Sequence, residues 1–548
     1  PKELLKAKFG IFHTSEGKFD QLGSTPEHRI RRLLEPITLA DSLATAHGIS
    51  QNEGMNYYGY QPDPDKRITF TVPTVSALLS IHLSTLAARA TPSALSQSLR
   101  RDTAVNAFVN AAWCFNDDTL LLSKGSDAVG RIQQILVPLK YSQEKTMTSL
   151  KQIVARATAW FSILPYSGPD LNPPSALEAF VFRTYGITMG EIGVCLFVLW
   201  AAGQPLMDET FFSNMKSFRG SPINRFLDAF GLPLQQFTSP WRVEKDLPPQ
   251  LTFRLPFLSQ RPVLKLGLDG MRPIYSVPIT RLVPHHFEEA FYWNCFDEMQ
   301  RLEPGKRGNT FSRWFGLVFE EYCMRLTAGV SSAAFQSLQH LRNHKPSLAG
   351  PDACEITNDT ALFFEFKARR LRRASALNWN DDSKAELKVA TDDVVDGLIR
   401  FADQFRSTAS HPLRNKIKKT HRVLFVVVTP SAFPCNIYMA KEGWYRDELK
   451  RISDFLGVSR PAKLIFAGIS DLEIVDRRRR GGTYWGPLWK AYSSDPEYYQ
   501  ASFYEYYRLN NLAAVKQGMN PFLSGMLDLN LAATEDLFLP DQSPTSQQ

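Results

Sequence analysis

Apolar residues recur at three- and four-residue spacing through most of the first 245 residues, which is the period of one helix face. The spacing is clearest in Val75–Ala88, Val105–Phe115 and Met147–Leu164. Segments rich in proline and glycine, such as Tyr166–Asp170, interrupt it and predict turns. The pattern therefore predicts a mainly helical region that ends near the proline pair at 248–249.

The pattern changes after this proline pair. Short apolar runs predict strands at 251–258, 262–266, 274–277, 423–428, 463–467 and 472–475. Helical spacing predicts helices at 284–302, 310–327 and 381–405. Two more strands flank Asn358-Asp359. This order indicates an α/β (α+β) fold, in which a helical N-terminal region precedes a mixed-sheet core flanked by helices.

The hairpin around Asn358-Asp359 carries the candidate chemistry. Both residues tolerate positive φ, so they suit a two-residue hairpin turn. Thr357 then faces Thr360. In the same register Asp352 lies directly opposite Glu365, with the two Cβ atoms about 5 Å apart.

Lys367 lies two residues beyond Glu365 and projects from the same face of the strand. Two carboxylates so close together repel each other unless positive charge lies between them. Their hard oxygen ligands favour Mg²⁺, for which Mn²⁺ can substitute. A cation here would polarise a phosphoryl oxygen while the lysine orients water, which predicts metal-assisted phosphodiester hydrolysis. The alternative is a surface hairpin with a cross-strand ion pair.

These residues resemble a known group of enzymes. Pro351-Asp352, twelve intervening residues and then Glu365-Phe366-Lys367 resemble the PD-(D/E)xK nuclease superfamily, which has a restriction-endonuclease-like fold. The upstream segment Gly316–Tyr322 (GLVFEEY) is similar to a Gly-x-x-Phe-Glu-x-Tyr helix found in many of these nucleases. The resemblance covers roughly residues 250–475.

The resemblance implies a set of site residues. Asp352 and Glu365 would be metal ligands, and Lys367 would be the catalytic lysine. The main-chain carbonyl of Phe366 would be a further ligand, and Glu320 an additional acidic contributor to catalysis and metal binding. Some branches of the superfamily complete the site with a glutamine on the helix after the motif, and Gln404 is the candidate here.

The resemblance also predicts the organisation of the chain. Residues 1–247 would be an accessory, partner-binding or sensing region, 248–480 the nuclease domain, and 481–548 an aromatic-rich C-terminal extension with a disordered tail. This layout resembles uncharacterised bacterial nucleases of anti-phage defence. The expected partners are DNA and either further copies of the chain or a second defence-system subunit. The alternatives are an RNA substrate, or a catalytically inactive nuclease-fold subunit that binds DNA or a partner.

Charge supports a polyanionic partner. The formal net charge is +8, and from 367 to 422 there are 14 Lys and Arg residues against 7 Asp and Glu. Clustered Lys and Arg side chains bind a phosphate backbone. The residues expected to contact nucleic acid are Arg369, Arg370, Arg372, Arg373, Lys416, Lys418 and Lys419.

Composition narrows the class of protein further. With 44% hydrophobic and 22% charged residues, the chain can bury a large core, which excludes a mostly disordered protein. Its six cysteines form no CxxC pair, which argues against structural zinc and for a reducing cytoplasm. The longest apolar run, Ile192–Gly203, is shorter than the roughly 20 residues that cross a bilayer, so it predicts a buried helix. We expect no signal peptide and no membrane association.

Overall fold

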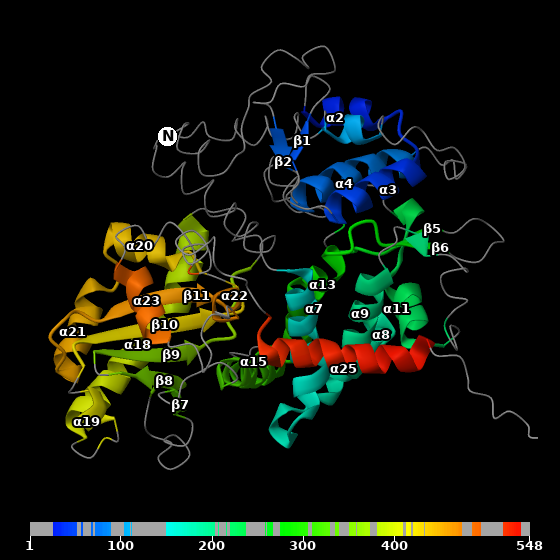
Figure 1. Ribbon diagram of the computed structural model, residues 1–548. Helices are drawn as coiled ribbons and strands as arrows, with labels where there is room; N and C mark the ends of the chain where they lie inside the picture. The colour runs from blue at the N-terminus through cyan, green and yellow to red at the C-terminus, as the bar shows by residue number, and fades with distance from the viewer. Residues whose placement is uncertain are drawn as a thin grey trace, which may run out of the picture.

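The computed structural model describes residues 26–51, 56–58, 67–69, 72–88, 104–109, 111, 149–202, 206–207, 215, 220–236, 258, 260–266, 274–304, 309–328, 335–338, 350–357, 359–372, 381–408, 411, 413–417, 420–431, 433–473, 485–494, 503 and 519–538. Figure 1 shows the arrangement of helices and strands in these ranges. Their buried apolar side chains form three hydrophobic cores. The fold is a mixed α and β fold, as the sequence predicts.

A five-stranded sheet, in the order β11-β10-β9-β8-β7, carries the predicted site. Its strands are β7 (Phe335–Ser337), β8 (Ala353–Ile356), β9 (Thr360–Phe366), β10 (Arg422–Thr429) and β11 (Lys463–Gly468). β7, β8 and β9 pair antiparallel, whereas β9, β10 and β11 are parallel. β10 is buried after its first residue, because its β-branched and aromatic side chains pack on both faces of a central strand.

Helices flank both faces of this sheet. They are α15 (Thr310–Ala328), α18 (Asp381–Ser407), α19 (Arg414–Ile417), α20 (Cys435–Glu442), α21 (Arg446–Leu456), α22 (Ile469–Leu472) and α23 (Trp485–Ser494). Side chains of α18, α20 and α21 share a core with Phe363 and Phe425. Side chains of α15 and α23 share a different core with Phe364, since neighbouring residues of a strand point to opposite faces.

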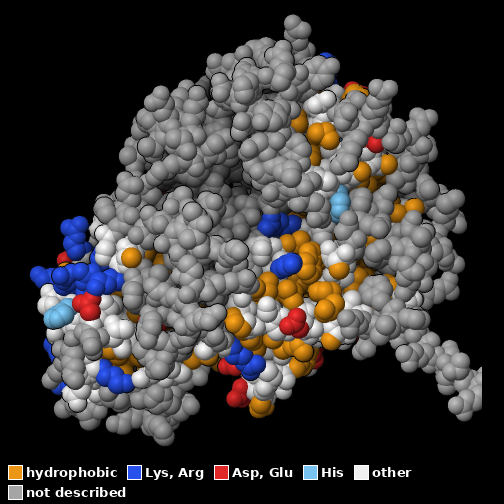
Figure 2. Space-filling view, in the orientation of Figure 1, with side chains coloured by type: hydrophobic (Ala, Val, Ile, Leu, Met, Phe, Trp, Pro, Cys, Tyr) orange, Lys and Arg blue, Asp and Glu red, His pale blue; other side chains and the backbone are white. Residues whose placement is uncertain are grey.

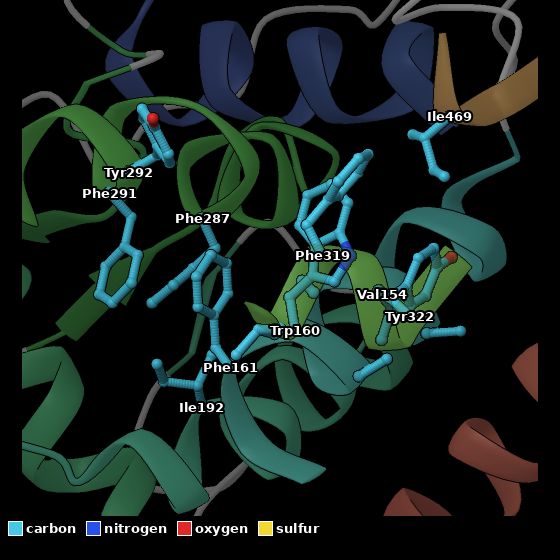
Figure 3. Close-up of a cluster of buried hydrophobic side chains, with 14 of the residues drawn as sticks. Val154, Trp160, Phe161, Ile192, Phe287, Phe291, Tyr292, Phe319, Tyr322 and Ile469 are labelled. Carbon is cyan, nitrogen blue, oxygen red and sulfur yellow. The ribbon is translucent and has the colours of Figure 1, made fainter. Parts of the chain in front are cut away.

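A further layer of helices packs against α15. It consists of α7 (Leu150–Thr158), the π-helical η3 (Ala159–Ile163), η4 (Leu164–Tyr166), η5 (Pro169–Leu171), α8 (Ser175–Tyr185), η6 (Met189–Glu191), α9 (Ile192–Ala202), α11 (Pro222–Phe230), α13 (Leu282–Glu288), α14 (Ala290–Leu302) and α25 (Pro521–Phe538). α7 begins where Ser149 and Gln152 form a capping box. The fully buried Trp160 packs edge-on against Phe319 and Tyr322 of α15, with ring centroids 6.0 Å and 5.6 Å away (Figure 3). Aromatic packing therefore joins this layer to the sheet.

Helices α2 (Pro26–Leu34), α3 (Leu39–Gln51) and α4 (Val72–Ala88) share a core with side chains of a small four-stranded sheet. The strands of this sheet are β3 (Leu206–Met207), β4 (Leu232–Pro233), β5 (Leu264–Leu266) and β6 (Ile274–Ser276), and η7 (Leu234–Gln236) follows β4. Met207 of β3 packs instead in the core that contains α15. β1 (Asn56–Tyr58) and β2 (Arg67–Thr69) pair in a separate two-stranded sheet. The small sheet has the order β3-β6-β5-β4. β3 and β4 precede the expected boundary at 247/248, and β5 and β6 follow it. The sheet thus joins the two segments that the sequence analysis divides.

The C-terminal extension is also part of the fold. α23 contacts β9 and β8, and α25 contacts α7 and α9. Trp489 is fully buried and stacks on Phe503, with the ring centroids 3.9 Å apart. The predicted disordered tail lies outside the described residues.

Most of the predicted elements that can be compared are confirmed, with two corrections. The predicted helix at 284–302 is two helices, α13 and α14, which meet at Glu289. The predicted strand at 472–475 does not begin at Leu472, which is the last residue of α22, and residues 474 and 475 lie outside the described residues. The Asp471 carboxylate accepts the Gly468 N–H at 2.9 Å and so starts this helix. β7 is a strand that the sequence analysis did not predict.

The apolar run beginning at Ile192 forms α9, a largely buried helix, as predicted. Over the described part of the chain, no single helix is long and apolar enough to cross a membrane. Two consecutive helical segments, Ser175–Tyr185 and Met189–Ala201, are long and apolar enough for a membrane span only when they are taken together, and they are bent by 55° relative to each other.

Candidate active site

The β8–β9 hairpin has the predicted register over its four paired residues, but the predicted pair Asp352–Glu365 is not part of the ladder. Its cross-strand pairs are Ala353–Phe364, Cys354–Phe363, Glu355–Leu362 and Ile356–Ala361. At the turn, the Thr357 N–H donates to the Thr360 carbonyl at 2.9 Å. Asn358 lies outside the described residues. This pairing brings Asp352, which precedes β8, beside the C-terminal end of β9.

Asp352 lies at an irregularity of the ladder. Its N–H donates to the Phe364 carbonyl at 2.8 Å, although Ala353 is the residue paired with Phe364. Two residues thus face one, which is the arrangement of a β-bulge, and bulges redirect side chains. The Asp352 carboxylate Oδ2 accepts the Phe366 N–H at 2.6 Å, and the residue is only 2% exposed. The carboxylate is therefore held against the end of β9.

Glu365 and Lys367 form an ion pair at this strand end. Lys367 Nζ lies 2.5 Å from Glu365 Oε1, so the two side chains project to the same side, as predicted. The Lys367 N–H donates to the Val428 carbonyl at 2.9 Å, which ties the strand end to β10. The Glu365 side chain is 13% exposed and that of Lys367 is 39% exposed. The pair therefore lies at the boundary between core and solvent.

Glu320 lies on α15, the helix that packs under this sheet. Burial raises the pKa of the Cys323 thiol well above its usual range, and the charges of Asp352, Glu473 and Glu320 raise it further. Glu320 itself lies about one helical turn before Cys323 on α15. Its role as an acidic contributor stays a prediction.

A divalent cation would find hard oxygen ligands here. The Asp352 and Glu365 carboxylates belong to neighbouring chain segments, and Glu365 has already attracted a cationic group, the Lys367 ammonium. Strand geometry directs the Phe366 carbonyl to the same side as its N–H, which bonds to Asp352. The donor chemistry therefore fits Mg²⁺. In the ranges that the structure describes, no three His, Cys, Asp or Glu side chains are grouped to hold a metal ion.

Gln404 lies on α18 about one turn beyond Phe401 and is half-buried. The Phe401 ring packs against Phe363, with centroids 5.4 Å apart, so this part of α18 covers the middle of β9. Glu365 and Lys367 lie at the end of the strand instead. The role of Gln404 in completing the site stays a prediction.

Three of the expected nucleic-acid contacts are exposed: Arg369, Arg372 and Lys416. Arg369 pairs with Asp393, and Lys416 donates to Gln336 at 3.1 Å. Exposed pairs of this kind are weak, so both side chains can exchange partners. Arg373, Lys418 and Lys419 lie outside the described residues. Figure 2 shows basic side chains at the left of the molecule, the side on which the five-stranded sheet lies.

The expectation for Arg370 is wrong. Its guanidinium lies over the rings of Tyr292 and Trp160, at 4.8 Å and 5.4 Å from their centroids, and it donates to the Glu288 carbonyl. The Nε and Nη2 atoms are buried. Three residues past Lys367, the chain turns inward against the helical layer, so Arg370 cannot reach a phosphate backbone.

Arg156 is the centre of a buried ion network near Arg370 that the sequence did not predict. Arg156 donates to Glu473 at 2.8 and 2.6 Å and to Glu288 at 2.7 Å. Tyr322 donates to Glu473 at 2.5 Å. Burial raises the pKa of Glu288, but Arg156 and His285 lower it more strongly, to about 2. These residues are far apart along the chain, so no local pattern could reveal the network.

A scan against protein-family models, a search of curated proteins and a search of solved structures found no match to this chain. The geometry of Asp352, Glu365 and Lys367 is therefore the basis for a functional proposal.

Proposed function

We propose that this protein is a metal-dependent nuclease that hydrolyses DNA phosphodiester bonds. The observation that carries the proposal is that the end of β9 bears the Glu365–Lys367 ion pair and also binds the Asp352 carboxylate through the Phe366 N–H. Buried or half-buried ionisable groups that converge at a strand end are typical of active sites. Because the layout of the chain resembles that of bacterial defence nucleases, we extend the proposal to defence against phage or other foreign DNA.

The architecture supports this proposal. α15, the antiparallel strands β7–β9, α18 and the parallel strand β10 follow one another along the chain. This order agrees with the mixed-sheet core flanked by helices that the nuclease resemblance implies. Glu365 lies on β9, the central strand of that core, and Asp352 and Lys367 directly flank β8 and β9, where packing on both faces keeps the backbone rigid.

Each residue has a role that follows from its surroundings. Asp352 is held by the Phe366 N–H and would supply a carboxylate oxygen as a ligand. Glu365 is the second carboxylate, and in this structure its charge is balanced by Lys367. A bound Mg²⁺ would supply the Lewis acid that polarises the scissile phosphate. Once the cation balances Glu365, the Lys367 ammonium can turn to orient the attacking water.

The exposed basic residues would bind the substrate backbone. Arg369 and Arg372 follow Lys367 closely, so a phosphate backbone that enters the site would pass near them. Lys416 lies farther away, beside β7, as its contact with Gln336 indicates. Such contacts bind any sequence and weaken as salt rises.

The test is a substrate panel. Purified protein is incubated with plasmid, linear duplex, single-stranded DNA and RNA, in Mg²⁺, in Mn²⁺ and in EDTA. We expect cleavage of DNA with either metal, none with EDTA, and loss of cleavage in Lys367→Ala with DNA affinity retained. Lys384→Ala is the matched control, because Lys384 forms a similar half-exposed ion pair, with Glu442 at 2.8 Å. A parent protein that binds DNA but cleaves no substrate would indicate the binding-subunit alternative instead.

A further inference from the structure

The segment after β9 leaves the sheet along an unusual path. Lys367 is the last residue tied to β10, through its N–H and the Val428 carbonyl. From Ala368 to Arg370 the chain runs against α13 and α14, which belong to the helical layer rather than to the sheet. Lys367 therefore lies between two anchors, one in the sheet and one in the helices.

Arg370 forms the helical anchor. Its guanidinium faces three aromatic rings, at 4.8 Å from the centroid of Tyr292, 5.4 Å from Trp160 and 5.8 Å from Phe315. It also donates to the Glu288 main-chain carbonyl at the end of α13. A guanidinium that packs against aromatic rings and also donates to a main-chain carbonyl has little freedom to move.

Tyr292 strengthens the same anchor. Its ring lies under Arg370, and its hydroxyl donates to the Ala368 carbonyl at 3.5 Å. Tyr292 is only 4% exposed and packs edge-on against Phe311 and Phe315, with both centroid distances 5.1 Å (Figure 3 shows Tyr292 in this cluster). Because Tyr292 is packed this firmly, its hydrogen bond to Ala368 couples the position of α14 to the position of the backbone one residue past Lys367.

The anchor reaches further into the helical layer through Glu288. The backbone of this residue binds Arg370, while its carboxylate binds Arg156 of α7 at 2.7 Å. Arg156 in turn lies over the ring of Trp160, the same ring that Arg370 faces, with a centroid distance of 5.8 Å. The helices before and after the expected boundary at 247/248 thus meet at the residues that hold the strand exit.

We propose that Arg370 is a positioning residue of the nuclease site, which fixes the exit of β9, and with it Lys367, to helices α13 and α14. This inference rests on the proposed function. It assigns the helical layer a part in catalysis, because any shift of α13 or α14 moves the backbone beside Lys367. A displacement of about 1 Å of a catalytic group can lower a rate by about 10²-fold.

The test compares Arg370→Met, Arg370→Lys and Tyr292→Phe with the parent protein. Single-turnover cleavage at saturating plasmid and Mg²⁺ is measured across pH 6–10 beside DNA affinity, and amide hydrogen exchange is followed in the peptide spanning 364–372. We expect Arg370→Met to cut the cleavage rate about 10²-fold with unchanged DNA affinity, to alter its pH profile, and to speed exchange in this peptide. Arg370→Lys should recover part of the rate, since it restores the cation over the rings. Tyr292→Phe, which keeps the ring, should show a smaller effect in the same direction.

Arg225→Met is the matched control. Arg225 also donates to main-chain carbonyls, those of Gly186 and Gly220, but it lies on α11. We expect it to change neither the cleavage rate at saturation nor exchange at 364–372. A fall in DNA affinity as large as the fall in rate would overturn the proposal, because it would make Arg370 a phosphate contact. Unchanged exchange in Arg370→Met would also overturn it, and this readout decides the question even if the parent protein cleaves nothing.

Discussion

The ion network around Arg156 allows a quantitative prediction about the junction between the helices and the sheet. The Arg156 side chain is only 5% exposed and is the shared partner of the Glu288 and Glu473 carboxylates. Replacing it with methionine keeps much of its length and removes its charge. Two buried carboxylates then lose the cation that they share, while His285 still lies 3.4 Å from Glu288.

The expected loss of stability follows from two independent estimates. Removing one member of a buried charge pair costs about 3–5 kcal/mol, because the remaining charge stays buried. The pKa of Glu288 falls from 4.5 to about 2 in the folded protein, a shift of about 3 kcal/mol, and Arg156 is the largest of the favourable causes, ahead of His285 and Arg370. We therefore expect Arg156→Met to lose about 3–5 kcal/mol of unfolding free energy at pH 7.

The loss should depend on pH in a defined direction. A carboxyl group whose pKa is lowered by folding stabilises the protein above its unfolded pKa, and that contribution disappears as pH falls through the folded pKa. For Glu288 this window runs from 4.5 down to about 2. In Arg156→Met burial dominates instead, so the carboxylate takes up a proton at higher pH. The gap between variant and parent should therefore narrow as pH falls below about 5.

The assay is urea unfolding followed by tryptophan fluorescence at pH 7, 5 and 4. The exposed Arg183, which pairs with Glu298, supplies the control variant Arg183→Met, and we expect it to leave the unfolding midpoint nearly unchanged. Adding Glu288→Gln and Glu473→Gln to Arg156→Met should restore part of the stability, since no uncompensated charge remains. A loss below about 1 kcal/mol, or a gap that widens in acid, would refute the reasoning.

Substitutions of two buried aromatic residues and of one glycine test the packing of the fold. Phe363→Ala should cost about 3–5 kcal/mol, because the ring is fully buried and stacks on Phe425, and a urea midpoint unchanged from the parent would contradict this. Trp489→Ala should cost a similar amount, because Trp489 is fully buried in the core that α23 shares with Phe364, and a loss under about 1 kcal/mol in the same assay would contradict this packing. Gly186→Ala should lower the melting temperature more than Gly457→Ala. Both glycines have φ +70°, but only at Gly186 would a Cβ meet a backbone carbonyl oxygen, at 2.5 Å.

Local geometry explains which parts of the site could be predicted from sequence. The hairpin register follows from a two-residue turn and strand alternation, so the meeting of Asp352 with the end of β9 was predictable. The same alternation predicts the shared side of Glu365 and Lys367. The bulge at Asp352 was not predictable, because it depends on how the ladder adapts to the packing around it.

Long-range packing explains what the sequence could not show. Arg370 stands in a run of basic residues and has the pattern of a phosphate contact, yet its partners are rings of α14 and η3, far away along the chain. The boundary at 248–249 rests on a proline pair, whereas the small sheet pairs β4 with β5 across it. Leu472 was predicted to begin a strand, but it ends α22, whose first turn is capped by the Asp471 carboxylate at the Gly468 N–H.

Cation binding tests the central claim most directly. Mn²⁺ titrated into the protein is followed by electron paramagnetic resonance, in the parent, in Asp352→Asn, in Glu365→Gln and in the control Asp228→Asn, whose carboxylate lies elsewhere and binds Lys265. We predict a saturable Mn²⁺ site in the parent and in the control, weakened at least about 10-fold by either site substitution. Equal Mn²⁺ binding by all four proteins would contradict a cation site shared by Asp352 and Glu365.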